Sequence, residues 1–225
     1  MRYIYFWTII FAVIFYSGCK LPNANENKPV SVSPPPFLWA DELFESEEIE
    51  DGLTLTIFKT NDPLHWTHHG LTMWTVRGDE QAVFNSRTVT MAKTSGYSGG
   101  GYGIVFCHGE YDVDDEEVTA MLVIMINNEG QYIIGKALGG VFIDFGWWKS
   151  TSVLQRHSGA SNKITVSFDE IAEEFCLIIN DTEIERFSDN EIPQLRGGRN
   201  GYIAVVTPFD NFPASGINVR FIEEL

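Results

Sequence analysis

The sequence predicts an all-β protein built as an antiparallel sandwich of two sheets. Its 225 residues include 16 Phe, 8 Tyr and 6 Trp, and aromatic side chains suit a pleated, half-buried surface. Short apolar runs alternate with turn residues along most of the chain, at intervals typical of sandwiches and barrels. No amphipathic helical pattern of useful length is present, apart from a short acidic turn near Ala40–Ile49. The length fits one domain with short appendages.

Runs of alternating or continuous apolar character mark the expected strands. Two connections carry turn chemistry typical of hairpins, because Asn127–Gly130 and Asn180–Asp181 supply Asn, Asp or Gly where left-handed backbone is needed. No repeat at the period of a propeller or solenoid is present. The expected strands are Leu53–Phe58, Leu71–Val76, Arg87–Ala92, Tyr102–Cys107, Ala120–Ile126, Tyr132–Lys136, Val141–Phe145, Lys163–Phe168, Phe175–Ile179, Glu183–Phe187, Tyr202–Val206 and Val219–Ile222.

Residues 1–18 predict a signal peptide. Arg2 is followed by the apolar run Tyr3–Tyr16, which is too short to span a bilayer core of ~30 Å, and the chain then turns polar. The sequence YSGC at Tyr16–Cys19 resembles the lipobox of bacterial lipoproteins, in which the Cys becomes the lipidated N-terminus, although Tyr stands where Leu is usual. We therefore expect a lipid on Cys19, with an ordinary secretory signal as the alternative.

Residues 19–36 predict a Pro-rich tether that precedes the folded domain at 37–225. Its prolines favour polyproline II, which would hold the domain up to ~50 Å from the lipid. Lys20 follows the acylated Cys, in place of the Asp that retains lipoproteins in the inner membrane of enteric bacteria. The expected location is therefore the bacterial cell envelope, with the outer membrane favoured, the lipid on Cys19 as the membrane anchor, and the domain facing the periplasm or the cell surface.

Charge and cysteine content limit the partners and the covalent structure. The chain has 15 Lys plus Arg against 31 Asp plus Glu, and its net charge of -16 argues against nucleic acid as a partner, because phosphates would be repelled. Outside the cytoplasm a disulfide between Cys107 and Cys176 is permitted. Both residues lie in apolar runs where a free thiol packs equally well, so the sequence leaves both states open.

Four short motifs recur in an order typical of one family. They are Gly103–Phe106, Gly130–Tyr132, Trp147 or Trp148, and Leu177–Asp181. Together they resemble the concanavalin A-like jelly-roll domains of bacterial secreted proteins, which are similar to laminin-G-like modules and to the 3-keto-disaccharide hydrolase-like group. The order of elements matches from Leu53 to Leu225, and Asp181 stands where the family usually has Gly. The resemblance implies a two-sheet antiparallel jelly roll whose concave face often holds sugars, and it leaves activity open.

The acidic run Glu110–Glu117 invites comparison with the E-x-D-x-(x)-E strand of family 16 glycoside hydrolases, whose alternate carboxylates share one strand face. Its spacing does not reproduce that motif, and its place between two strong strands predicts a solvated loop. We therefore expect no catalytic residue. A glycosidase or a 3-keto-glycoside hydrolase would have only Glu110, Asp112 and His68 or His69 to use.

Two clusters contain metal-ligating side chains. The carboxylates of Asp112, Asp114 and Asp115 are of the kind that calcium prefers, but the run lacks the Gly and the terminal Glu of an EF-hand loop. The three histidines of His65–His69 lie within five residues, at most two of them share a strand face, and no second cluster completes a zinc site. We expect no metal or other cofactor, with calcium as the alternative.

Aromatic side chains are the stronger functional candidates, because sugars stack their C–H faces on indole and phenol rings. Most large aromatics in a sandwich fill its core. Adjacent Trp147 and Trp148 must point in opposite directions if extended, so one can be core and the other exposed, and the resemblance implies that Trp148 is the core residue. Arg196 and Arg199 lie in an expected turn and could contact an anionic partner. The expected ligand-binding residues are Trp66, His68, Tyr97 and Trp147.

These features together predict a lipid-anchored, extracytoplasmic module that binds carbohydrate or another envelope ligand without catalysis. A glycoside-cleaving enzyme is one alternative. A protein-binding envelope lipoprotein, in which the sandwich serves only as a shape, is another.

Overall fold

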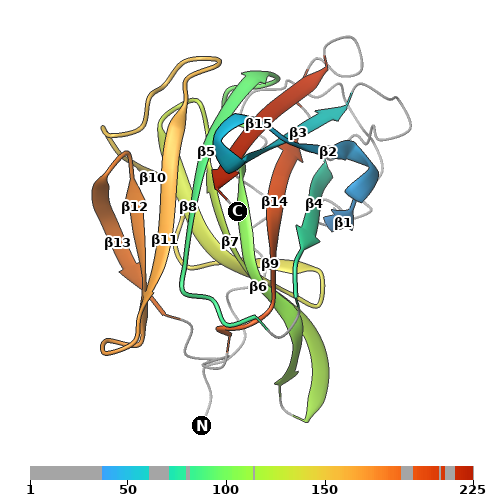
Figure 1. Cartoon of the computed structure of the whole chain (residues 1–225), viewed down its shortest axis with the longest axis vertical. Coiled ribbons are helices and arrows are strands. Elements are labelled where there is room, and N and C mark those ends of the chain that lie inside the picture. The colour runs from blue at the N-terminus through green and yellow to red at the C-terminus, as the bar shows by residue number, and fades with distance from the viewer. Residues whose placement is uncertain are drawn as a thin grey trace, which may run out of the picture. The chain divides into compact units, whose positions relative to one another are not determined.

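A computed structural model of the chain describes residues 37–60, 71–79, 82–113, 115–188, 195–207, 209–210 and 216–224. These residues form two packed sheets, antiparallel except for one parallel pair, β1 with β4 (Figure 1). The predicted all-β jelly-roll sandwich is confirmed. The predicted signal peptide, the tether and Cys19 lie outside the described residues. Within the described ranges, no helix has the length and apolar character needed to cross a membrane.

The strands follow the predicted apolar runs, with ends that differ by up to several residues. Three short strands, β1, β2 and β10, were not predicted. The expected acidic turn at Ala40–Ile49 is wrong over most of its length, because Phe44 packs on Phe58 and draws its segment into a strand. The elements are β1 (Phe37–Trp39), η2 (Asp41–Leu43), β2 (Phe44–Glu48), η3 (Glu50–Gly52), β3 (Leu53–Thr60), β4 (Leu71–Arg77), β5 (Ser86–Ser95), β6 (Tyr102–Val113), β7 (Glu116–Ile126), β8 (Gln131–Leu138), β9 (Val141–Asp144), β10 (Lys149–Ser150), β11 (Asn162–Asp169), β12 (Glu174–Ile179), β13 (Thr182–Phe187), β14 (Arg199–Val206) and β15 (Ile217–Glu224).

Sheet A has the order β1-β4-β14-β6-β7-β8-β10, with β9 also paired to β8, and sheet B has the order β13-β12-β11-β5-β15-β3-β2. Both predicted hairpins are confirmed. The turn at Asn127–Gly130 joins β7 to β8 and contains Gly130 with a φ of 82°. The turn at Asn180–Asp181 joins β12 to β13, and both of its residues have positive φ.

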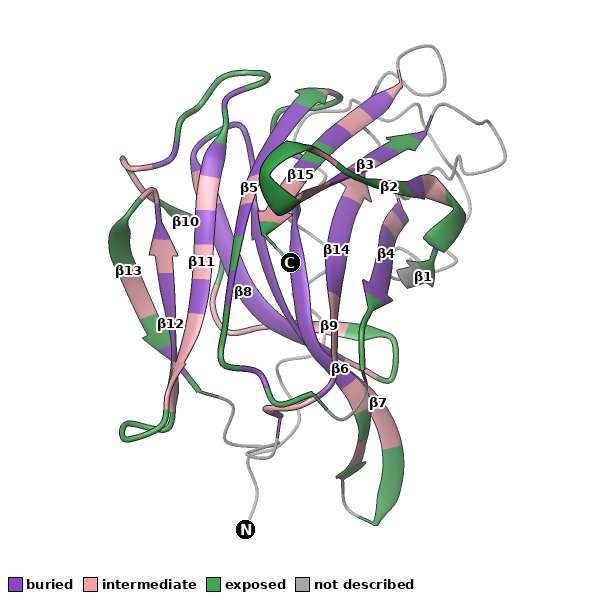
Figure 2. Cartoon of the chain, viewed as in Figure 1, coloured by how far each residue is buried: buried purple, intermediate pink, exposed green. Residues whose placement is uncertain are grey.

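Apolar side chains cover both faces of sheet A. On β7, Leu122 and Ile124 pack toward sheet B, whereas Met121 and Val123 point away from it and join a second apolar cluster. Figure 2 shows the consequence, because β7 is buried along most of its length while β11 of sheet B alternates between buried and half-buried residues. Apolar side chains therefore form a second packed layer on the outer face of sheet A, the face that points away from sheet B.

A buried ionic network ties the two sheets together. Arg87 of β5 donates to both carboxylate oxygens of Glu223 on β15, at 2.6 and 2.7 Å. Its Nη1 reaches across to sheet A and donates to the carbonyl oxygens of Val105 and Gly201, at 3.0 and 2.7 Å. The Arg87 guanidinium lies 4.8 Å from the ring centre of Tyr202, whose hydroxyl donates to Glu223 at 2.5 Å.

The two cysteines of the domain are free thiols, which answers the question that the sequence left open. Cys107 belongs to the core between the sheets. Cys176 lies between Phe175 and Leu177 on β12, and because those two side chains face the core, the Cys176 thiol points to the other side of sheet B. Burial raises the pKa of both thiols, which keeps them protonated and unreactive at neutral pH.

Candidate functional site

An aromatic and cationic cluster lies on the outer face of sheet A. β1 runs parallel to β4 with Trp39 in register with Trp74, and their ring centres are 5.2 Å apart. The imidazole of His108 lies 5.2 Å from Trp74 and 6.2 Å from Trp39. The guanidinium of Arg199 lies 5.5 Å from the ring centre of Trp39 and 3.5 Å from His108 Nδ1. We call these four residues the Trp39 cluster.

The residues of the Trp39 cluster differ in exposure: Trp74 and His108 form a buried base, and Trp39 forms an exposed platform above it. Trp74 and His108 are buried and belong to the packed outer layer of sheet A, whereas 48% of Trp39 is exposed. A large indole ring that is held from beneath by another indole and flanked by a guanidinium loses little conformational freedom when a ligand covers it. The cluster thus presents one preformed, half-exposed indole with the donors of the Arg199 guanidinium beside it.

A β-bulge on β6 places His108 in this cluster. Phe106 pairs with Leu122 and Gly109 pairs with Ala120, so Cys107 and His108 together oppose one residue of β7. Cys107 takes a left-handed conformation with a φ of 56°, which is uncommon for a residue with a Cβ atom. Because side chains alternate along a strand, the extra residue turns His108 outward beside Arg199, its pairing partner on β14.

The same bulge brings two carboxylates to the outer face of sheet A. β6 continues to Val113, so the expectation of a solvated loop at Glu110 and Asp112 is wrong: both are exposed residues of a strand that is paired with β7. Thr119 of β7 donates to Glu110 at 2.7 Å. Figure 1 shows this end of the β6–β7 hairpin extending beyond the rest of sheet A. His108, Glu110 and Asp112 therefore line one strand face, and His108 at its start lies 6.2 Å from the exposed indole of Trp39.

The sequence-predicted ligand residues are distributed differently. Trp66 and His68, like His65 and His69, lie outside the described residues. Tyr97 is in the loop before β6, where it is 38% exposed and its ring centre lies 5.3 Å from that of Phe209. Trp147 is 55% exposed in the connection between β9 and β10, and its neighbour Trp148 packs on the outer layer of sheet A.

The Trp39 cluster was not predicted as a site. A single Trp in a three-residue strand gives no periodic signal, and the bulge that turns His108 to the outer face leaves no mark in the sequence other than the His-Gly pair that interrupts the apolar run. Arg199 was expected in a turn, but it begins β14 and its position is set by pairing with His108.

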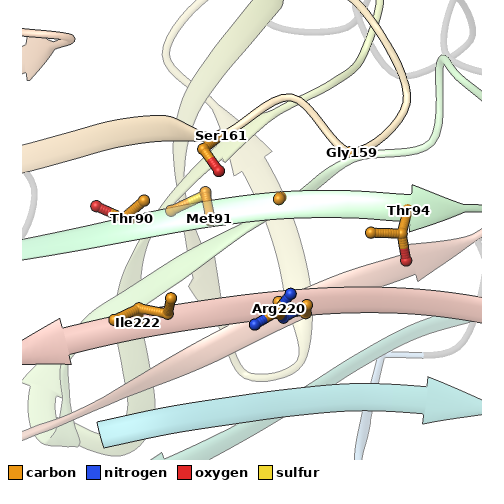
Figure 3. Close-up of a pocket in the computed structure, with 8 residues that line it drawn as sticks. Thr90, Met91, Thr94, Gly159, Ser161, Arg220 and Ile222 are labelled. Atoms are coloured by element: carbon orange, nitrogen blue, oxygen red, sulfur yellow. The ribbon is translucent and has the colours of Figure 1, made fainter. Parts of the chain in front are cut away.

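No group of three or more His, Cys, Asp and Glu side chains within the described ranges could hold a metal ion. The calcium alternative at Asp112–Asp115 includes Asp114, which lies outside these ranges. A shallow depression of about 110 Å³ lies on the outer face of sheet B, between Thr90, Thr94, Ser161 and Arg220 (Figure 3). Binding pockets for small molecules usually measure ~300–1,000 Å³, so this depression is too small to hold a sugar ring in a closed site.

No family model and no curated protein sequence matches the chain. Among solved structures, a prokaryotic β-1,3-1,4-glucanase (lichenase) derived from a mouse hindgut metagenome superposes with a TM-score of 0.53 at 10% identity, covering 86% of this chain and 88% of the glucanase. The carbohydrate-binding module CBM66 from Bacillus subtilis gives a TM-score of 0.49 at 10% identity, over 84% of this chain and 99% of the module. A Bacillus licheniformis β-glucanase gives 0.49 at 8% identity, over 89% and 93%. The chain has the concanavalin A-like jelly-roll fold that the resemblance implied.

Proposed function

We propose that the protein is an extracytoplasmic, lipid-anchored module that binds carbohydrate at the Trp39 cluster. The observation that carries this proposal is the half-exposed indole of Trp39, held against Trp74 at 5.2 Å and flanked by Arg199. The C–H groups of a sugar ring pack on the negative face of an indole, and the hydroxyls at the ring edge need donors and acceptors nearby. Arg199 supplies donors, and the carboxylate of Glu110 supplies acceptors.

Trp39→Ala is expected to weaken glycan binding at least tenfold, because a preformed aromatic platform at the centre of a small site carries much of the binding energy. The full chain is tested on an array of neutral and acidic oligosaccharides that includes β-1,3-1,4-glucan fragments, and dissociation constants are measured by calorimetry for the glycans that bind. Trp39→Phe should keep part of the affinity. Ile171→Ala, which removes a side chain that is 97% exposed elsewhere, should change nothing. A wild-type chain that is folded and binds no glycan contradicts the proposal.

The anchor has its own test. With Cys19 acylated, the full chain is expected to sediment with membranes and Cys19→Ser to move it to the soluble fraction, because each buried CH₂ of a lipid chain contributes ~0.8 kcal/mol. Mass spectrometry of the N-terminal peptide reports the acylation directly. An unmodified Cys19, or a Cys19→Ser chain that still sediments with membranes, would contradict lipid anchoring. Separation of inner and outer membranes then tests the proposed outer-membrane location.

A glycosidase is the second candidate, and one observation favours it. His108, Glu110 and Asp112 line one strand face beside the aromatic platform, where a bound glycan would place its linkages over two carboxylates. Hydrolysis of a bound glycan by the wild type that is lost in Glu110→Gln, with binding retained, would favour the enzyme. Binding without turnover favours the module.

A further inference from the structure

A second pair of exposed aromatic rings lies at the end of sheet A where β6 begins. Tyr97 belongs to the loop between β5 and β6, and Phe209 follows β14. The rings are 5.3 Å apart and tilted by 42°, and the exposed fraction is 38% for Tyr97 and 55% for Phe209. Two large apolar side chains that remain half exposed gain little stability from burial, so hydrophobic packing alone does not explain why they are held together.

One buried carboxylate fixes the backbone on both sides of this pair. Asp210 is 5% exposed, and its Oδ1 accepts a hydrogen bond from the backbone N–H of Tyr97 at 2.5 Å. Its Oδ2 accepts from the backbone N–H of Thr207 at 2.6 Å and from the Thr207 hydroxyl at 2.9 Å. Thr207, two residues before Phe209, and Tyr97 are thus bound to the carboxylate of Asp210, the residue that follows Phe209.

A buried ammonium group fixes the loop from the other side. Lys93 is 1% exposed and donates to the carbonyl oxygens of Tyr97 and Gly100, at 2.8 and 3.1 Å. Burial lowers the pKa of Lys93 to about 8, and the negative charge of Asp210 opposes that shift. Gly100 allows the loop to close over the ammonium, because a Cβ atom there would lie 2.6 Å from Lys93 Nζ. Burying the charges of Lys93 and Asp210 costs stability, and both charged groups bind the backbone of the loop that carries Tyr97.

The surroundings of the two rings are acidic and open. A Cβ atom at Gly99 would lie 2.7 Å from the Tyr97 ring and 3.2 Å from the carboxylate of Glu129, so the missing side chain leaves both groups uncovered. The Ser98 hydroxyl donates to Glu129 at 2.9 Å. Carboxylates accept hydrogen bonds from hydroxyl groups and repel anions. A ligand here would present an apolar face to the rings and neutral hydroxyls to Glu129.

We infer that Tyr97 and Phe209 form a second carbohydrate-binding surface, specific for neutral sugars and separate from the Trp39 cluster. It shares with the proposed function only the class of ligand, because the two surfaces have no residue in common. The seven residue-to-residue steps from Gly101, just before β6, to His108 separate them by roughly 20 Å at ~3.3 Å per step. Two weak sites at that spacing would engage one long glycan together. Because the second site then binds a ligand that the first site already holds, the overall affinity would exceed that of either site alone.

The test compares full-length proteins on the same oligosaccharide array: the wild type and Trp39→Ala, each alone and each combined with Phe209→Ala or with a substitution of Tyr97. Trp39→Ala should retain weak binding to neutral oligosaccharides, and adding Phe209→Ala should reduce that residual affinity about tenfold or abolish it. Acidic oligosaccharides should not bind through the second surface. Tyr97→Phe keeps the ring and should behave like the wild type, whereas Tyr97→Ala should behave like Phe209→Ala.

The outcomes separate the two sites. If Phe209→Ala and Tyr97→Ala match the wild type in both backgrounds while Trp39→Ala abolishes binding, the second surface is refuted and the proposed function stands. If Trp39→Ala has no effect and Phe209→Ala abolishes binding, the Trp39 cluster is refuted and the second surface stands. If no glycan binds the wild type, both are refuted. Melting temperatures that agree within a few degrees confirm that each variant is folded.

Discussion

Replacing Glu223 by Gln is expected to lower the free energy of unfolding by about 3–5 kcal/mol, measured by urea denaturation. Arg87 is almost fully buried and Glu223 is its only ionic partner among the described residues. Burial alone would lower the pKa of Arg87, and the hydrogen bonds and charge of Glu223, together with Tyr202, outweigh that effect and raise it. With a neutral Gln in place of Glu223, the guanidinium stays charged between the sheets without a counter-charge.

Two further variants make this result specific. Glu224→Gln changes an exposed neighbour on β15 and should alter stability by less than about 0.5 kcal/mol. Arg87→Met combined with Glu223→Leu removes both charges and should recover much of the loss, because a buried ion pair is often replaceable by apolar side chains. A Glu223→Gln chain that loses under about 1 kcal/mol would show that water reaches the guanidinium and compensates its charge.

Gly201→Ala is expected to cost about 3 kcal/mol or more and to disrupt the pairing of β14 with β4. A Cβ atom at residue 201 would lie 1.7 Å from the carbonyl oxygen of Thr75 and 2.7 Å from the Cα of Val76. Both are backbone atoms, so no rotation of a side chain relieves the overlap and β4 must move away. Because β4 carries Trp74 and pairs with β1, the Trp39 cluster would lose its base, and glycan binding should fall with stability.

Gly109→Ala is the matched control in the neighbouring strand. A Cβ atom there would first meet the ring of Tyr111 at 3.5 Å, an ordinary contact, so the change in stability should stay within about 1 kcal/mol. Thermal unfolding followed by near-ultraviolet circular dichroism, which reports the packing of Trp74, compares the two variants. Equal melting temperatures for Gly201→Ala and the wild type would contradict the close approach of β4 to β14.

Local pattern was sufficient to predict most of the sandwich. Strands such as Ala120–Ile126 and Lys163–Phe168 appeared in the sequence because their apolar residues are continuous or alternate, and the turns at Asn127–Gly130 and Asn180–Asp181 contain the residues that left-handed backbone favours. β1 and β10 were missed because strands of three and two residues are too short to show a period. They exist only because β4 and β8 offer them an edge to pair with.

The candidate site was harder to predict because the pairing of distant strands brings its residues together, and no local sequence pattern marks them. Trp39 gains its neighbours from a parallel register with β4, and Arg199 meets His108 across two paired strands although the two residues are 91 positions apart in the sequence. The sequence singled out aromatic residues in loops as binding candidates, and of these Tyr97 and Trp147 are exposed, while their role in binding stays a prediction. Which of the exposed rings has a rigid base and polar neighbours depends on contacts that no local segment contains.

The bulge at Cys107 has a consequence for how this surface could change over time. The hydroxyl of Tyr111 donates to the carbonyl oxygens of Cys107 and Gly197, at 2.9 and 2.6 Å, and so ties the bulged strand from its inner side. A chain one residue shorter at this point would exchange the two faces of β6 beyond the bulge, turning Tyr111 to solvent and the carboxylates of Glu110 and Asp112 toward the interior. A substitution usually alters one side chain of a recognition surface. The loss of one residue at the bulge would instead reverse the orientation of all the β6 side chains that follow it. The number of residues in β6 therefore determines this surface as much as the identities of those residues do.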